Sequence, residues 1–220
     1  MAELPVDLGE LPVQIREGAA DGDPGVDGEG RWLLPVFTAS PTLELFRAPT
    51  DNDSSKVFAG RLTGSGFDAP HREVLRVSSG PGRAVTEELL VATHEVRHSR
   101  TVSVVGPGHY RVDEAVDVPP GATDLLRIGT TLALIDGYTD VEWFGLGPAE
   151  NYPDRRAGAL LGRWTSAIDE MDVPYVRPQE QGSRGRTQEI VLTGHGVPDI
   201  RLRLGVPLQV GVTRYSTRDL

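Results

Sequence analysis

The sequence predicts an all-β protein that is built as a large antiparallel sandwich of two sheets. Glycine and proline occur 26 and 17 times among 220 residues, a content that favours short strands and tight turns over long helices. Between residues 72 and 133, short apolar runs alternate at regular spacing with turns rich in glycine and proline, a pattern typical of a sandwich. Only residues 56–66 suggest a short helix, which glycine would end.

The first thirty residues differ from the rest of the chain. They contain one strand candidate, residues 13–16, and then residues 18–30, in which glycine, aspartate and alanine dominate. This composition predicts an exposed turn or insertion. We therefore divide the chain into an N-terminal strand with a flexible segment, residues 1–30, and a main domain, residues 31–220.

The main domain is a series of strand candidates. They cover residues 32–34, 43–46, 72–78, 84–94, 95–105, 109–118, 124–133, 158–163, 188–193, 200–206 and 208–215. Within residues 109–118 the alternation of polar and apolar side chains slips at Glu114 and Ala115, which predicts a β-bulge. Because the chain stops at Leu220 just after a strand, we expect either a fragment or an unpaired edge that a partner covers.

Composition excludes several classes of protein. The formal net charge of −10 argues against nucleic acid as a partner, since phosphates require a basic surface. The absence of cysteine excludes disulfides, thiolate metal ligands and a thiol nucleophile. With no signal peptide and no long apolar run for a membrane, the sequence predicts a soluble, cytoplasmic protein.

Polar side chains are concentrated in a first cluster at residues 141–155. The cluster begins as a strand and is broken by Gly145, Gly147 and Pro148. The candidate site residues that follow are Glu150, Asn151, Tyr152, Asp154 and Arg155. Loops fixed at the end of a strand are where binding chemistry usually occurs.

A second cluster reads Phe46-Arg-Ala-Pro-Thr-Asp-Asn-Asp53 and offers Asp51, Asn52 and Asp53 as acceptors on a turn. The alternative is that these residues only form the turn by bonding their own backbone. The third cluster, residues 174–184, holds an extended segment between two prolines, and we expect it to expose Tyr175, Gln179, Glu180 and Arg184. It is either a rigid polyproline connection or a surface suited to a polyhydroxylated ligand.

Catalytic chemistry has weak support in these residues. No serine lies in a Gly-x-Ser-x-Gly turn. His94 and His98 lack a third metal ligand nearby, so we expect no metal site. Glu150, Asp154 and Glu180 could supply the carboxylate pair of a glycosidase, but the sequence favours structural or substrate-orienting hydrogen bonds for them.

Taken together and in order, the three clusters resemble the β-galactosidase small chain, the C-terminal domain of family 2 glycoside hydrolases. The matching motifs are the second cluster, then Trp143-Phe-Gly-Leu-Gly-Pro-x-Glu-Asn-Tyr-Pro-Asp-Arg155, then Pro174-Tyr-Val-x-Pro-Gln-Glu-x-Gly182. The resemblance implies a supersandwich similar to galactose mutarotase. It also implies that the whole enzyme hydrolyses terminal β-galactosides such as lactose with retention.

The resemblance places the catalytic glutamates and the Mg²⁺ and Na⁺ ligands on a separate TIM-barrel domain, so we expect no catalytic residue or bound metal in this chain. The small chain would instead help to wall the galactoside pocket and would make subunit contacts in an oligomer. The residues to which the resemblance gives a role in the pocket or in organising its loops are Arg47, Asp51, Asn52, Asp53, Glu150, Asn151, Tyr152, Asp154, Arg155, Tyr175, Gln179 and Glu180.

The chain departs from the family pattern at two places. Gln181 stands where the family has asparagine, and the family continues past Tyr215 to a tryptophan that reaches the substrate, whose match would lie beyond Leu220. A stand-alone sugar-binding sandwich is the alternative function. An epimerase on the same fold would need a histidine beside a glutamate, and none of the three clusters contains histidine.

Overall fold

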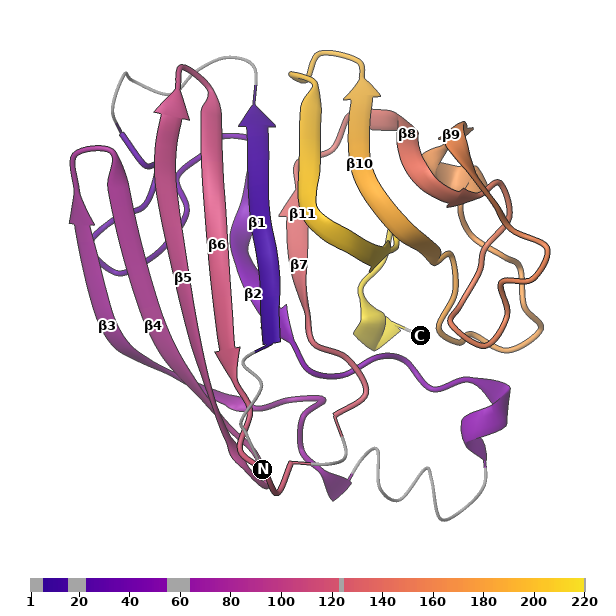
Figure 1. Ribbon diagram of the computed structural model, residues 1–220, viewed down its shortest axis with the longest axis horizontal. Helices are drawn as coiled ribbons and strands as arrows, with labels where there is room; N and C mark the ends of the chain where they lie inside the picture. The colour runs from indigo at the N-terminus through magenta and orange to yellow at the C-terminus, as the bar shows by residue number, and fades with distance from the viewer. Residues whose placement is uncertain (1–5, 16–22, 55–63, 123–124, 220) are drawn as a thin grey trace.

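The computed structural model describes residues 6–15, 23–54, 64–122 and 125–219, which form two antiparallel β-sheets (Figure 1). The larger sheet has nine strands in the order β3-β4-β5-β6-β1-β11-β10-β8-β9, and the smaller sheet pairs β2 with β7. The strands are β1 (Val6–Ile15), β2 (Phe37–Glu44), β3 (His71–Gly80), β4 (Arg83–Val91), β5 (Glu95–Gly106), β6 (His109–Asp117), β7 (Gly129–Leu134), β8 (Tyr138–Gly147), β9 (Leu160–Ala167), β10 (Arg184–Gly194) and β11 (Ile200–Val210). Three single-turn helices, η1 (Asp51–Ser54), η2 (Ile168–Glu170) and η3 (Thr217–Asp219), complete these elements.

The predicted all-β sandwich is confirmed, and the predicted turns join its hairpins. Gly82 between β3 and β4 and Gly108 between β5 and β6 have positive φ angles of 72° and 64°, a conformation that glycine adopts at no steric cost. In the part of the chain that the structure describes, no helix is long and apolar enough to cross a membrane. The helix expected over residues 56–66 lies largely outside the described residues.

Apolar side chains between the two sheets form two core clusters. The larger one joins Trp32, Val36 and Phe37 to side chains of β5, β6, β8, β10 and β11. The smaller one packs Leu43 and Leu45 against side chains of β4, β5 and β6. Burial of this apolar surface is the main force that holds the layers together.

Two expectations about the ends of the chain are corrected. β11 is not an edge strand, because it pairs with both β1 and β10. Residues 23–30 are not simply an exposed turn, because Val26 is 5% exposed, forms a β-bridge with Trp32 and belongs to the larger core cluster. The segment is anchored by Val26, whose burial the glycine-rich composition of its neighbours does not predict.

The irregularity expected at Glu114 lies on only one side of β6. The pairing with β5 is regular there, with Glu114 opposite Arg100, whereas the register with β1 shifts between the pairs Asp7–Ala115 and Glu10–Asp113. Glu114 points inward with its apolar neighbours and receives hydrogen bonds from Arg100 and from Thr130 of β7. Arg100 also donates to the carbonyl oxygen of Pro41 in β2 at 2.7 Å. A buried ion pair therefore links the two sheets, and this charge inside the sandwich produced the apparent slip in the alternation.

Candidate functional site

The three polar clusters occupy loops that meet in one region of the molecule. The first follows β8, the second follows β2 and includes η1, and the third precedes β10 (Figure 1). β8 and β10 are neighbours in the large sheet, so the loop that leaves one strand lies beside the loop that enters the other. Hydrogen bonds then tie each loop to the next.

Asp53 joins the two ends of the second cluster by hydrogen bonds. Its carboxylate accepts hydrogen bonds from the Arg47 guanidinium at 2.6 and 3.1 Å and from the backbone and hydroxyl of Thr50 at 2.6 and 2.9 Å. Burial alone would raise the pKa of Asp53, but the donors Arg47 and Thr50 outweigh it and lower the pKa. Asp53 therefore acts as an ionised anchor of the turn.

The second and third clusters are joined by a side-chain carboxylate and a side-chain amide. Glu180 accepts from the backbone nitrogen of Ala48 at 3.1 Å and from the guanidinium of Arg127, and the Gln179 amide oxygen accepts from the backbone nitrogen of Asp51 at 3.0 Å. The backbone nitrogen of Glu180 also donates to the Pro49 carbonyl oxygen. The three contacts with Ala48, Pro49 and Asp51 fix the beginning of η1 against the third cluster.

Glu150 joins the first and third clusters. Its carboxylate accepts hydrogen bonds from the Tyr175 hydroxyl, the Gly182 backbone nitrogen and the Arg155 guanidinium, and its side chain is 6% exposed. Burial would raise the pKa of Glu150, but these donors lower it below its usual range. Tyr152 lies beside it, and burial together with the charge of Glu150 raises the pKa of the Tyr152 hydroxyl.

Asn151 organises the same loop from a fully buried position, with 2% of the residue exposed. Its amide nitrogen donates to the carbonyl oxygens of Leu146 and Ala149, and its amide oxygen accepts from the backbone nitrogen of Gly185 at 2.8 Å. An asparagine can satisfy donors and acceptors at once, so this residue connects the end of β8 to the start of β10.

The remaining predicted site residues differ in exposure. Asp51, Asn52 and Asp154 are exposed, and the side chain of Arg155 is 58% exposed although it pairs with Glu150. Gln179 and Arg184 are buried, contrary to the expectation that the third cluster exposes them. They are buried because their polar groups bond to neighbouring backbone, as for Gln179 above.

The substitution at Gln181 leaves the loop intact. The left-handed conformation falls on Gly182, with a φ of 74°, rather than on Gln181. The Gln181 side chain accepts from the Val173 backbone nitrogen at 2.8 Å and donates to the Tyr215 hydroxyl at 2.5 Å. Its longer side chain thus connects the third cluster to the segment after β11.

Two further arginines stabilise this region, and Arg127 was missed by the sequence analysis. Arg184 donates to the carbonyl oxygens of Pro148 and Gly182 at 2.9 and 3.0 Å, and its guanidinium lies 5.3 Å from the ring centroid of Trp143. Arg127 pairs with Glu180. A buried carboxylate signals that a cation is needed, but the sequence does not indicate which of many arginines supplies it.

The chemistry of the site is that of a hydrogen-bonded scaffold. Each of its partly or fully buried carboxylates, Asp53, Glu150 and Glu180, is paired with an arginine of its own. General acid catalysis at neutral pH requires a carboxyl group with a raised pKa, and the pKa values of Asp53 and Glu150 are lowered. Within the described ranges, no group of three His, Asp or Glu side chains is placed to hold a metal ion.

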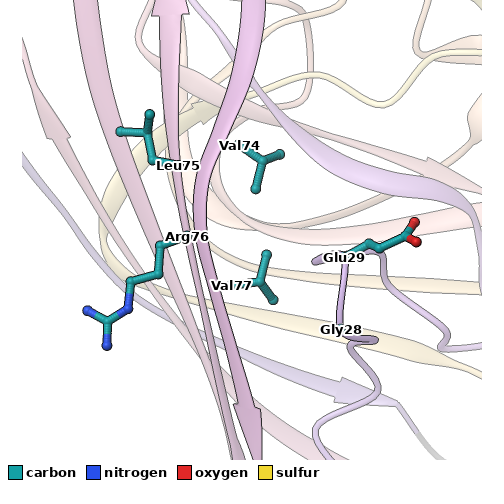
Figure 2. Close-up of a pocket in the computed structure, with 6 residues that line it drawn as sticks. All are labelled: Gly28, Glu29, Val74, Leu75, Arg76 and Val77. Carbon is teal, nitrogen blue, oxygen red and sulfur yellow. The ribbon is translucent and has the colours of Figure 1, made fainter.

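A shallow hollow of about 480 Å³ lies away from these loops (Figure 2). It is lined by side chains of edge strand β3 and by the turn before Arg31, namely Gly28, Glu29, Val74, Leu75, Arg76 and Val77. Polar groups converge on a typical ligand site, whereas this hollow has one acidic and one basic side chain on separate segments. The loops of the three polar clusters, which hydrogen bonds tie together, are therefore the better candidate for the functional site. We call them the tied loops.

The fold and the site together define an antiparallel β-sandwich in which three polar loops are joined by hydrogen bonds and by carboxylate–arginine pairs. A family model described as β-galactosidase small chain matches residues 26–220. The chain belongs to the β-galactosidase small chain family.

Curated relatives agree with this assignment. The chain is 31% identical over 218 residues to a β-galactosidase of Arthrobacter sp., a match that covers 88% of this chain and 21% of the relative. It is 37% identical over 113 residues to a β-galactosidase of Yersinia enterocolitica, covering 51% of this chain and 10% of the relative. It is 45% identical over 84 residues to a β-galactosidase of Vibrio cholerae, covering 36% and 8%. The matched stretch is thus about a fifth or less of each of these relatives.

Proposed function

We propose that this chain is the small-chain module of a β-galactosidase and helps to form the galactoside pocket for retaining hydrolysis of lactose-type substrates. The catalytic glutamates, and the Mg²⁺ and Na⁺ ions, would belong to a TIM-barrel domain with which this module associates. The observation that carries the proposal is the joining of three loops into one surface by Glu150, Gln179 and Glu180. Such a surface can wall a pocket without supplying the reacting groups.

A mixing assay tests the proposal. A version of the Arthrobacter relative that lacks the region matched here would be titrated with this chain, and hydrolysis of a chromogenic β-galactoside would be measured. We expect the mixture to hydrolyse the substrate and each component alone to be inactive. If the mixture is no more active than its components, the proposed role is wrong.

A stand-alone carbohydrate-binding sandwich is the second candidate. It is favoured by the exposed side chains of Asp51, Asn52 and Asp154 and by the half-buried ring of Tyr175, all next to the tied loops. Hydroxyl groups of a sugar can bond to these carboxylates and amides, and its C–H face can pack on an aromatic ring. Calorimetric titration of the isolated chain with galactose or lactose would detect such binding, and no heat of binding would rule this candidate out.

A further inference from the structure

The third cluster has a tip, residues 174–178, that projects from the site. Among the large hydrophobic side chains of the described residues, Val176 has the highest exposed fraction, 102%. Its neighbours Pro174, Arg177 and Pro178 are exposed as well. Single exposed hydrophobic residues are common on protein surfaces, so the surroundings of Val176 decide whether it has a role.

The base of this tip is fixed on both sides. At its start, the Tyr175 hydroxyl donates to Glu150 and accepts from Arg155, and directly after it the buried Gln179 side chain accepts a hydrogen bond from the backbone of Asp51. The flanking prolines, Pro174 and Pro178, each restrict φ. The tip is therefore held in one position although Val176 is left fully exposed to solvent. A segment ordered in advance loses little entropy when a partner binds it.

The charge of the tip itself differs from that of the whole chain. The formal net charge is −10, yet the one charged side chain of residues 174–178 is the exposed Arg177. Beside the tip, Arg155 contacts the Tyr175 hydroxyl, and the exposed carboxylates of Asp51 and Asp154 belong to the neighbouring loops. Arginine is enriched at protein interfaces, and the buried centre of an interface is more apolar than its rim. A surface that complements the tip would have an apolar pocket bordered by carboxylates.

We propose that residues 174–178 are a docking loop for the catalytic domain, with Val176 in an apolar pocket of that domain and Arg177 paired with carboxylates at its rim. This inference rests on the proposed function, since it names the contact through which the module joins the enzyme. The catalytic domain is the chosen partner because at least 79% of the Arthrobacter relative lies outside the match, which covers 21% of it.

Titration of the truncated Arthrobacter relative with variants of this chain tests the docking loop. Val176→Asp should raise the concentration of chain needed for half-maximal hydrolysis at least about tenfold, because burying a valine contributes roughly that factor to an equilibrium constant. The activity at saturation should not change. Val105→Asp, which alters a 61% exposed valine at the end of β5, is the matched control and should behave like the unmodified chain.

The charged part of the docking loop is tested by Arg177→Glu, with Arg83→Glu at the exposed start of β4 as control. We expect Arg177→Glu to weaken association and the weakening to diminish as salt is raised. Thermal unfolding of all four variants should match that of the unmodified chain, since each altered residue is exposed.

The outcomes separate the two proposals. If the unmodified chain restores no activity, the proposed function fails. If the unmodified chain restores activity, and Val176→Asp and Val105→Asp reach half-maximal hydrolysis at the same concentration, the docking proposal is wrong and the proposed function stands. If Val176→Asp lowers only the activity at saturation, Val176 acts on the substrate. If Val176→Asp instead abolishes self-association of this chain in gel filtration, the tip joins copies of the chain. Either result would overturn the proposal that residues 174–178 dock on the catalytic domain.

Discussion

The Nε atom of Arg100 on β5 donates a hydrogen bond of 2.5 Å to the Oε1 atom of Glu114 on the neighbouring strand β6, and both side chains are buried. His98 lies beside this pair, with its Nδ1 atom 2.8 Å from Glu88. The distance of 3.8 Å from His98 Nε2 to Glu114 is too long for a direct hydrogen bond, so that contact is electrostatic. A group of four charged or titratable side chains thus lies in the interior of the sandwich.

Glu114→Gln should destabilise the protein by about 3–5 kcal/mol, because it leaves the buried Arg100 guanidinium without its counter-charge. Urea unfolding measures the change in free energy. Glu142→Gln is the matched control, since Glu142 pairs with Arg163 on the surface and is 37% exposed. It should cost less than about 1 kcal/mol, and equal costs for the two variants would contradict the assigned role of the buried pair.

Stability should also fall in acid because of Glu114. Burial would raise the pKa of this carboxyl, but His98, Arg100 and Thr130 lower it from 4.5 to about 2. A group with a lowered folded-state pKa stabilises the protein above its unfolded pKa, and this stability is lost as the pH falls from 4.5 towards 2. The loss would be about 3 kcal/mol. Glu114→Gln should show a shallower fall in unfolding free energy between pH 5 and pH 2, and an unchanged slope would count against Glu114.

His98 should have the opposite dependence on pH. Burial disfavours the charged imidazole, but Glu114 and Glu88 outweigh both this effect and the repulsion from Arg100, so the pKa of His98 is raised above 6.5. Its contribution is therefore complete below pH 6.5 and is lost as the pH rises through the raised value. The unfolding free energy should decrease from pH 6 to pH 9 in the unmodified chain and less in His98→Asn. An NMR titration of the imidazole with a midpoint below 6.5 would refute this.

Glu150→Gln should loosen the joined loops without unfolding the sheets. The variant weakens the charge-assisted bonds that Glu150 accepts from Tyr175, Gly182 and Arg155, and the loss should be about 1–3 kcal/mol. Hydrogen exchange at the Gly182 amide should become faster, while amides in β5 and β6 keep their protection. Asp154→Asn, at an exposed position of the same loop, is the control, and the same exchange rates in both variants would remove Glu150 as the anchor.

Gly182→Ala should be more harmful than Gly158→Ala, although both glycines lie near the site loops. Gly182 has a φ of 74°, and a Cβ atom there would lie 3.2 Å from the Met171 carbonyl oxygen, whereas a Cβ atom at Gly158 would meet nothing within 4 Å. An alanine in the left-handed region costs about 1–2 kcal/mol. Thermal unfolding would compare the two variants, and equal midpoints would show that the loop at Gly182 adapts.

Much of the fold follows from local sequence patterns. Glycine at the tips of the hairpins and alternating runs between them define β3 to β6 within a few residues, because turn chemistry and alternation are local properties. The positions of β1 and β11 in the centre of the large sheet could not be predicted, since pairing such as Val13 with Leu202 depends on residues far apart in the sequence.

The candidate site was predicted unevenly for the same reason. Its loop residues stand out as dense polar clusters, so Glu150, Asn151 and Gln179, which join the loops by hydrogen bonds, could be selected as candidates from the sequence. Arg127 was not found, because it lies far in sequence from Glu180, with which it pairs. The alternation in β6 appeared to slip at Glu114 because its carboxylate is buried among apolar side chains, and the register shift at this position belongs to the pairing with β1.

The central position of β1 affects the order in which the protein folds. β1 pairs with β6 on one side and with β11 on the other, so β1 completes its pairing only after the strand at Ile200–Val210 has been synthesised. Contacts between such distant segments slow folding, and until β11 is in place the side of β1 that does not face β6 has an unpaired edge. During synthesis, the side of β1 that awaits β11 is therefore where a chaperone would protect the nascent chain most effectively.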